Sequence, residues 1–237
     1  MGATEFRRTL VVGDIHGAHK ALVQVLERSA FDPQQDRLIS LGDLTDYHPD
    51  NAEVIDTLLA IPHLIAVRGN HDTWVQEYLE TGDPDTVWLH NGGEQTTESL
   101  YYLRSETQER YRRFFMNQKR YFIDEANRLF VHAGITPRIP IDMQRDAILY
   151  WDRALWTQAA RWNEYGEPFP DHPFLEIYIG HTPTNKYWPD ARPIHFGNIW
   201  NLDQGIKRTG KLSIMDVATK DYWQSDFAVD LYPMSNL

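Results

Sequence analysis

The amino-acid sequence predicts an α/β fold organised around a parallel β-sheet. In the first third of the chain, short apolar runs alternate with amphipathic helical patterns in the order strand, helix, strand, helix, strand. This order implies parallel strands that are joined by right-handed crossovers. Each of the strand patterns also ends in polar residues beside a glycine. Because ligands bind at the carboxyl edge of such sheets, we expect a functional site there.

The elements of the first third are short and clearly separated. Strands are predicted at residues 9–12, 37–41 and 63–67. Helices are predicted at residues 18–28 and 50–60, and a third helix is expected to begin at residues 74–79. In the two complete helices, apolar side chains recur at the i, i+1, i+4 and i+5 positions that share one helix face.

The rest of the chain gives weaker patterns. The predicted elements are a charged helix at 105–117, a strand hairpin at 120–123 and 128–132, a helix at 144–155, and strands at 177–179, 194–196, 199–202 and 212–217. Residues 156–173 are rich in Trp, Pro and Gly and are predicted to form a long irregular loop. We therefore expect one domain over residues 1–237, with a cap or substrate loop around residues 144–175.

The composition excludes several classes of function. The chain of 237 residues contains no cysteine, which rules out disulfide scaffolds, thiolate metal sites and a cysteine nucleophile. A net charge of −11 argues against stable binding to nucleic acid or to an anionic membrane. The sequence shows neither a membrane-spanning run of roughly 20 apolar residues nor a signal-peptide pattern. A cytoplasmic protein of undetermined oligomeric state is therefore expected.

Histidines, carboxylates and an amide at the strand ends form the strongest functional signal. They are Asp14, His16, Asp43, Asn70, His71, His132 and His181. Imidazole and carboxylate ligands without sulfur suit Mn²⁺, Fe, Zn²⁺ or Co²⁺ better than Ca²⁺. Even six of these seven side chains would exceed what one metal with an open position needs, but six are enough for two metals that share a bridging carboxylate. Two such metals can clamp a phosphoryl group between them.

Five motifs occur in a fixed order along the chain. They are Gly-Asp-x-His-Gly at 13–17, Gly-Asp-x-x-Asp at 42–46, Arg-Gly-Asn-His-Asp at 68–72, His-Ala-Gly at 132–134 and Gly-His-Thr at 180–182. With these motifs the sequence resembles the metallophosphoesterases of the phosphoprotein phosphatase (calcineurin-like) family. It is similar in particular to small bacterial and bacteriophage lambda-type Ser/Thr protein phosphatases. Residues 88–93 and 151–153 add to the resemblance, which runs from about residue 9 to about residue 216.

The resemblance implies a fold, a reaction and a set of roles. The fold is a sandwich of two mixed β-sheets flanked by helices, and the reaction is phosphoester hydrolysis by a metal-bridging hydroxide without a phosphoenzyme. The implied metal ligands are Asp14 and His16 for the first metal, Asp43 as the bridge, and Asn70, His132 and His181 for the second metal. The other implied roles are His71 as the proton donor to the leaving group, Asp46 as its orienting partner, and Arg68 and Arg153 as phosphate-binding residues. Manganese is the expected metal, with Fe, Zn²⁺ and Co²⁺ as alternatives.

The second motif departs from the family pattern. Where the family continues Asp-Arg-Gly, this chain has Asp46-Tyr47-His48. Neither Tyr47 nor His48 offers the planar fork of donors with which a guanidinium binds phosphate. The missing arginine predicts weaker phosphate binding or a different substrate. The alternative is that two metals, Arg68 and Arg153 still bind the phosphate, so that the loss of the arginine has no effect.

Three functions stay open on the sequence. The first is a phosphomonoesterase of the Ser/Thr protein phosphatase type, acting on a phosphorylated protein or a small phosphoester. The second is a symmetrical dinucleoside tetraphosphate hydrolase, because residues 131–137 resemble those enzymes. The third is a metal-binding module that recruits a partner without catalysis. Among the ligands, His195 is a rival to His181, which we prefer because it follows a glycine at a strand end.

Overall fold

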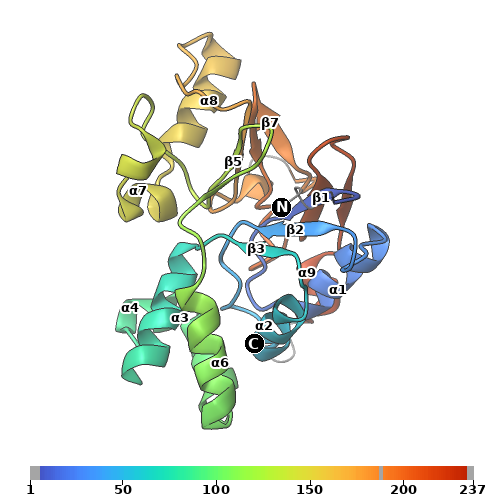
Figure 1. The fold of residues 1–237 in the computed structure, drawn as a ribbon, viewed down its shortest axis with the longest axis vertical. Helices are drawn as coiled ribbons and strands as arrows, with labels where there is room; N and C mark the ends of the chain where they lie inside the picture. Colours follow the sequence, from blue (N-terminus) through green and yellow to red (C-terminus); the bar gives the residue numbers. More distant parts are fainter. Residues whose placement is uncertain (1–5, 187–188, 234–237) are drawn as a thin grey trace, which may run out of the picture.

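The computed structural model describes residues 6–186 and 189–233, and its first sheet contains the parallel strands expected from the sequence (Figure 1). Its five strands lie in the order β10-β9-β1-β2-β3. The parallel strands are β1 (Thr9–Val12), β2 (Arg37–Ser40) and β3 (Leu64–Ala66). On the other side of β1, the strands β9 (Ser213–Asp216) and β10 (Tyr222–Gln224) run antiparallel.

The second sheet is also mixed. Its five strands lie in the order β4-β5-β6-β8-β7. They are β4 (Phe122–Ile123), β5 (Arg128–Phe130), β6 (Glu176–Ile179), β8 (Ile199–Asn201) and β7 (Ile194–Phe196). The inner strands β5, β6 and β8 are parallel, and the two edge strands are antiparallel to their neighbours.

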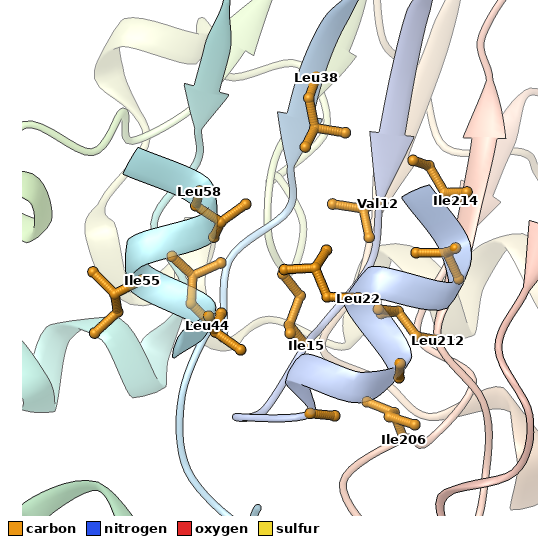
Figure 2. Packing of buried hydrophobic residues seen from close by; sticks show 14 of the residues in the cluster. Val12, Ile15, Leu22, Leu38, Leu44, Ile55, Leu58, Ile206, Leu212 and Ile214 are labelled. Carbon is orange, nitrogen blue, oxygen red and sulfur yellow. The ribbon is translucent and has the colours of Figure 1, made fainter. Parts of the chain in front are cut away.

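The apolar residues of the central strands point alternately to two cores. Val11 and Ile39 of the first sheet share a buried cluster with Phe130 and Tyr178 of the second sheet. The neighbouring residues in the first sheet point to its other face, as the two-residue period of a strand requires. There Val12, Leu38 and Ile214 pack against Leu22, Ile55 and Leu58 of the helices α1 (His19–Arg28) and α2 (Asn51–Leu59) (Figure 2). Helices therefore cover the outer face of the first sheet.

The connection between β3 and β4 is mostly helical. It contains α3 (Asn70–Thr81), α4 (Thr86–Trp88), the π-helical turn η1 (Leu89–Gly93), α5 (Glu94–Tyr101) and α6 (Ser105–Met116). Helix α3 begins four residues before the region where the sequence indicated one, and the segment from α4 to α5 was not predicted. The remaining short elements are η2 (Ile141–Met143), η3 (Thr184–Lys186) and α9 (Ala228–Leu231). None of the helices in the described ranges is long and apolar enough to cross a membrane.

The loop predicted at residues 156–173 is largely a helix, so that prediction was wrong. Helix α8 (Ala154–Tyr165) buries Leu155, Trp156 and Ala159 against the second sheet, and it ends where Gly166 takes a left-handed φ of 70°. The helix predicted at 144–155 is divided, because α7 (Asp146–Trp151) ends before Asp152, whose side chain caps α8 by accepting from Leu155 N at 3.0 Å. Helix α8 lies at the opposite end of the molecule from α6 (Figure 1).

Candidate functional site

The loops after the three parallel strands of the first sheet bring together His71 and the ligands predicted in this part of the chain. Asp14 and His16 follow β1, Asp43 follows β2, and Asn70 and His71 lie in the first turn of α3 after β3. The backbone approaches closely here, because a Cβ added to Gly69 would lie 2.2 Å from Asp43 Oδ1. Only glycine therefore fits between β3 and α3 at this distance from Asp43.

The second sheet supplies His132 and His181, which follow β5 and β6. The two sheets meet at this edge, since the backbone N–H of His181 lies 3.1 and 3.2 Å from the two carboxylate oxygens of Asp14. His195, the rival ligand, is exposed on edge strand β7, where its ring stacks on Trp200. Thus His181, and not His195, lies among the other predicted residues.

Asp43 lies at the centre of the cluster. Its Oδ2 is 3.6 Å from His16 Nε2 and 3.9 Å from His71 Nε2, and its Oδ1 is 3.4 Å from His132 Nε2. Two groups of possible ligand atoms share this carboxylate, each spanning at most 4.8 Å: His16, Asp43 and His71, and Asp43, His132 and His181. A carboxylate with histidines on each of its oxygens has the arrangement that a bridging ligand needs.

Asp14 and Asn70 extend these two groups. Asp14 Oδ2 lies 3.8 Å from His16 Nε2, and Asn70 Oδ1 lies 3.0 Å from His132 Nε2. All six residues expected as ligands are buried. They therefore form one cluster, although they come from five loops of two sheets.

Hydrogen bonds and burial favour metal binding by the three histidines expected as ligands. His16 Nδ1 bonds to the carbonyl of Thr45 at 3.0 Å and His132 Nδ1 to the carbonyl of Leu41 at 2.8 Å, which leaves each Nε2 to act as a ligand. His16 Nε2 is buried and has no hydrogen-bond partner. Burial, reinforced by the nearby His132, lowers the pKa of His181 to about 3, and burial lowers that of His16 well below its usual value. Neutral imidazoles bind metals, so these residues fit two divalent ions.

His71 and Asp46 form a separate pair beside this cluster. His71 Nδ1 lies 2.5 Å from Asp46 Oδ2, and the same carboxylate accepts from Trp88 Nε1 at 2.8 Å and Thr96 Oγ1 at 2.5 Å. Burial lowers the pKa of His71, but the negative charges of Asp43 and Asp46 outweigh burial, so that the pKa is raised overall. His71 thus holds a proton more readily than His16 or His181.

The two predicted arginines differ in their surroundings. Arg153 is exposed at the N-terminus of α8, with its Nε 3.4 Å from His181 Nε2. Arg68 is partly buried and donates from Nη2 to the carbonyl of Phe115 at 2.5 Å. The structure therefore brings Arg153 to the rim of the cluster, while one end of Arg68 is engaged by α6.

Sequence reasoning missed three charged residues of the site. Asp72 is part of the third motif, and it accepts four hydrogen bonds, from Gln118 and from the backbone N–H groups of Asp43, Leu44 and Gly69. Asp203 and Lys207 lie in the loop after β8, outside every motif. Asp203 directly follows the strand predicted at 199–202, which was the available signal, whereas Lys207 lies four residues further on and had none. Trp88 and Thr96 were also missed as partners of Asp46, although Trp88 begins a segment that adds to the family resemblance.

Comparison with known proteins agrees with this geometry. A family model described as calcineurin-like phosphoesterase matches residues 7–203. The chain is 30% identical over 218 residues to serine/threonine-protein phosphatase 1 of Salmonella typhimurium. This match covers 90% of this chain and 93% of that protein. It is 33% identical over 133 residues to the symmetrical bis(5'-nucleosyl)-tetraphosphatase of Pseudomonas fluorescens, with 55% of this chain and 43% of that protein covered.

A solved structure shows the same fold. The metallophosphoesterase from Sphaerobacter thermophilus superposes with a TM-score of 0.56 at 18% identity, over 94% of this chain and 90% of that chain. The two mixed five-stranded sheets confirm the predicted fold class. Since the family model spans most of the sequence and the strand-end loops hold possible metal ligands, the chain belongs to the calcineurin-like phosphoesterase family and is an enzyme that hydrolyses phosphoesters.

Proposed function

We propose that the enzyme is a phosphomonoesterase of the Ser/Thr protein phosphatase type, acting on a phosphorylated protein or a small phosphoester. The observation that supports this most is the His71–Asp46 pair, because His71 Nε2 lies 3.9 Å from Asp43 Oδ2, an oxygen of the carboxylate that both groups of possible ligands share. Such a pair can deliver a proton to a poor leaving group, such as the oxygen of a serine side chain. The relative from Salmonella typhimurium, which the chain matches over 93% of its length, is a serine/threonine-protein phosphatase by name.

The six ligands would hold two divalent ions, and we propose that the metal is manganese. Asp14 and His16 would hold one ion, Asn70, His132 and His181 would hold the other, and Asp43 would bridge them. When bound, the ions would neutralise charge on the phosphoryl oxygens and lower the pKa of the attacking water.

The other side chains would bind the phosphate and move one proton. His71 would hold a proton at Nε2, because Asp46 fixes its Nδ1 as a hydrogen-bond donor. Arg153 would bind a phosphoryl oxygen from the rim beside His181. Arg68 would bind through Nη1, because its Nη2 is held by Phe115.

A symmetrical dinucleoside tetraphosphate hydrolase is the second candidate. A hollow of about 340 Å³ beside the site is lined by Arg153, Lys207 and Arg208, and the described residues that line it include no carboxylate. Such a surface favours a substrate with several phosphate groups. The relative from Pseudomonas fluorescens is a tetraphosphatase by name, but it is matched over only 43% of its length.

We further propose one domain over residues 1–237, in which the region around 144–175 contacts the substrate. Trp151 at the end of α7 is exposed, and its ring lies 5.2 Å from that of Trp74 and 6.2 Å from that of His181. This places an aromatic surface next to the ligands, where it can contact the part of the substrate beyond the phosphate.

Hydrolysis by metal-stripped protein, with and without added Mn²⁺, tests both candidates. p-Nitrophenyl phosphate, a phosphoserine peptide and diadenosine tetraphosphate are compared in parallel. Mn²⁺-dependent release of phosphate from the peptide is the expected result, and ADP release from the dinucleotide with an inert peptide would favour the second candidate. If protein that has bound two metals hydrolyses none of the three compounds, both proposed functions are wrong.

A further inference from the structure

The loop after β8 brings a lysine to the position where the family arginine is missing. Lys207 is partly buried, and its Nζ lies 5.6 Å from the centre of the Tyr47 ring, which is a cation–π contact. Tyr47 in turn packs against the site, with its ring centre 5.1 Å from that of His16 and 5.8 Å from that of His71. Lys207 thus reaches the site over the residue that replaces the arginine.

The ammonium group of Lys207 lacks a fixed polar partner. It makes no hydrogen bond or ion pair with any residue in the ranges 6–186 and 189–233. Burial lowers the pKa of Lys207, but the charges of Asp203 and Asp43 outweigh burial and raise it overall. Lys207 is therefore a charged and partly buried donor whose three N–H groups are all available.

Metal binding would change the surroundings of this charge. Asp43 and Asp14, two of the carboxylates whose charge acts on Lys207, are proposed ligands of the divalent ions. With those charges neutralised by metal, the ammonium would be repelled by the ions and would lose the support of Asp43 and Asp14, while keeping that of Asp203. A bound anion between Lys207 and the metals would restore that support.

The space for such an anion lies between Lys207 and Arg153. The two side chains line the same hollow of about 340 Å³, together with Tyr47. A second hollow of about 590 Å³ also includes Tyr47 and Lys207 in its lining. Lys207 therefore stands at the junction of both hollows, on the side of the site where an arginine at position 47 would begin.

We propose that Lys207 is a phosphate-binding residue, which donates to a phosphoryl oxygen of the substrate and replaces the arginine absent at position 47. This inference rests on the proposed function and names the group that recognises the dianion of a phosphate monoester. Tyr47 positions Lys207 through the contact between its ring and the ammonium group. The alternative is a purely structural lysine, whose charge offsets that of the buried Asp203.

Binding of inorganic phosphate to the Mn²⁺-loaded protein, measured by calorimetry, tests the inference without turnover. The variants are Lys207→Met, Lys207→Gln, Lys207→Arg and the double variant Lys207→Met/Tyr47→Arg. Lys211→Met is the matched control, because Lys211 lies four residues away with its ammonium over the ring of Phe227. The number of metals per chain and the unfolding midpoint are measured for every variant.

The expected pattern is loss and recovery. A charge-assisted hydrogen bond is equivalent to about 10- to 100-fold in binding, so Lys207→Met and Lys207→Gln should weaken phosphate binding by that factor with two metals retained. Lys207→Arg should stay close to wild type, and Tyr47→Arg should restore most of the affinity to Lys207→Met. The control Lys211→Met should be unchanged.

Other results would overturn the inference. An unchanged dissociation constant for phosphate in Lys207→Met and Lys207→Gln shows that Lys207 does not contact the anion. A loss that follows loss of metal, or that neither arginine variant restores, shows a structural lysine. These failures differ from a failure of the proposed function, in which the wild-type protein with two metals would itself neither bind phosphate nor hydrolyse a monoester.

Discussion

Replacing Asp46 with asparagine tests the His71–Asp46 pair while keeping the shape of the side chain. Asp46 is fully buried, and its carboxylate accepts from His71 and Trp88 on Oδ2 and from Thr96 on Oδ1. An amide oxygen in the place of Oδ2 keeps the first two bonds, and the hydroxyl of Thr96 can turn to accept from the new amide nitrogen. The substitution therefore removes a negative charge and little else.

The lost charge acts on the proton of His71. Because Asp46 contributes to the raised pKa of His71, its neutralisation lowers that pKa, and the ring loses its proton at a lower pH than in wild type. A hydrogen bond to a charged partner contributes about 1.5–3 kcal/mol, which is about 10- to 100-fold in the protonated fraction. Above neutral pH, kcat for a phosphoserine peptide should fall by that factor, and it should recover partly as the pH is lowered.

The assay compares kcat against pH for the phosphoserine peptide and for p-nitrophenyl phosphate. p-Nitrophenolate leaves without being protonated, so its release should be nearly unchanged in Asp46→Asn. Asp56→Asn is a matched control, because Asp56 is half exposed on α2. An equal loss on both substrates at every pH, with less metal bound, would refute the reasoning, because Asp46 would then act on the metal ligands and not on the proton.

Further substitutions test the proposed proton donor, the metal ligands and the residues that hold them in place. His71→Asn should keep both metals and lower kcat by about 10²–10⁴ on poor leaving groups; full turnover of a phosphoserine peptide would remove His71 as the acid. Asp43→Asn should lose metal together with activity, since Asp43 belongs to both ligand groups, and two metals per chain by mass spectrometry would contradict a bridge. Gly180→Ala should displace Asp14 and reduce bound metal, because the new Cβ would lie 2.0 Å from Asp14 Oδ1; an unchanged metal content would show that the loop adapts. Asp72→Ala leaves four hydrogen-bond donors without an acceptor, and each costs about 1–3 kcal/mol if it stays buried and unpaired. The free energy of unfolding, measured in urea, should therefore fall by several kcal/mol. An unfolding midpoint equal to that of the wild type would show that water replaces the carboxylate.

The sequence predicted well those helices and strands whose own spacing of apolar residues determines their secondary structure. The strand at 9–12 is found at those residues, and the helix predicted at 18–28 begins only one residue later, because apolar residues there face a core on a regular period. Helix α5 was missed because its eight residues are mostly polar and only Thr96 and Leu100 are buried. Strand β10 is three residues long and has no buried residue, so its pairing with β9 depends on tertiary contacts.

The same distinction separates the site residues that were predicted from those that were missed. The six expected ligands follow strands that the sequence indicates, and topology then brings strand ends together. Lys207 and Asp203 follow β8, which the sequence also indicates as a strand, but its position beside β6 is set by packing of the second sheet and not by any local pattern. Their contribution to the site could therefore be seen only in three dimensions.

Five non-glycine residues of the strand-end loops have strained backbone conformations. His16, Asp43 and His181 have positive φ values of 50°, 50° and 64°, and Asp46 and Tyr47 have values of 81° and 66°. Each non-glycine residue in this region costs of order 1–3 kcal/mol, so five of them close together must be held by their surroundings. The carbonyl of Asp43 accepts from His16 N at 2.9 Å and from Ile15 N at 3.0 Å, which ties the first two strand-end loops to each other. Glycine at any of these positions would relieve the strain, so the contacts of each side chain must hold its backbone in place. The contacts of Tyr47 are with His16, His71 and Lys207.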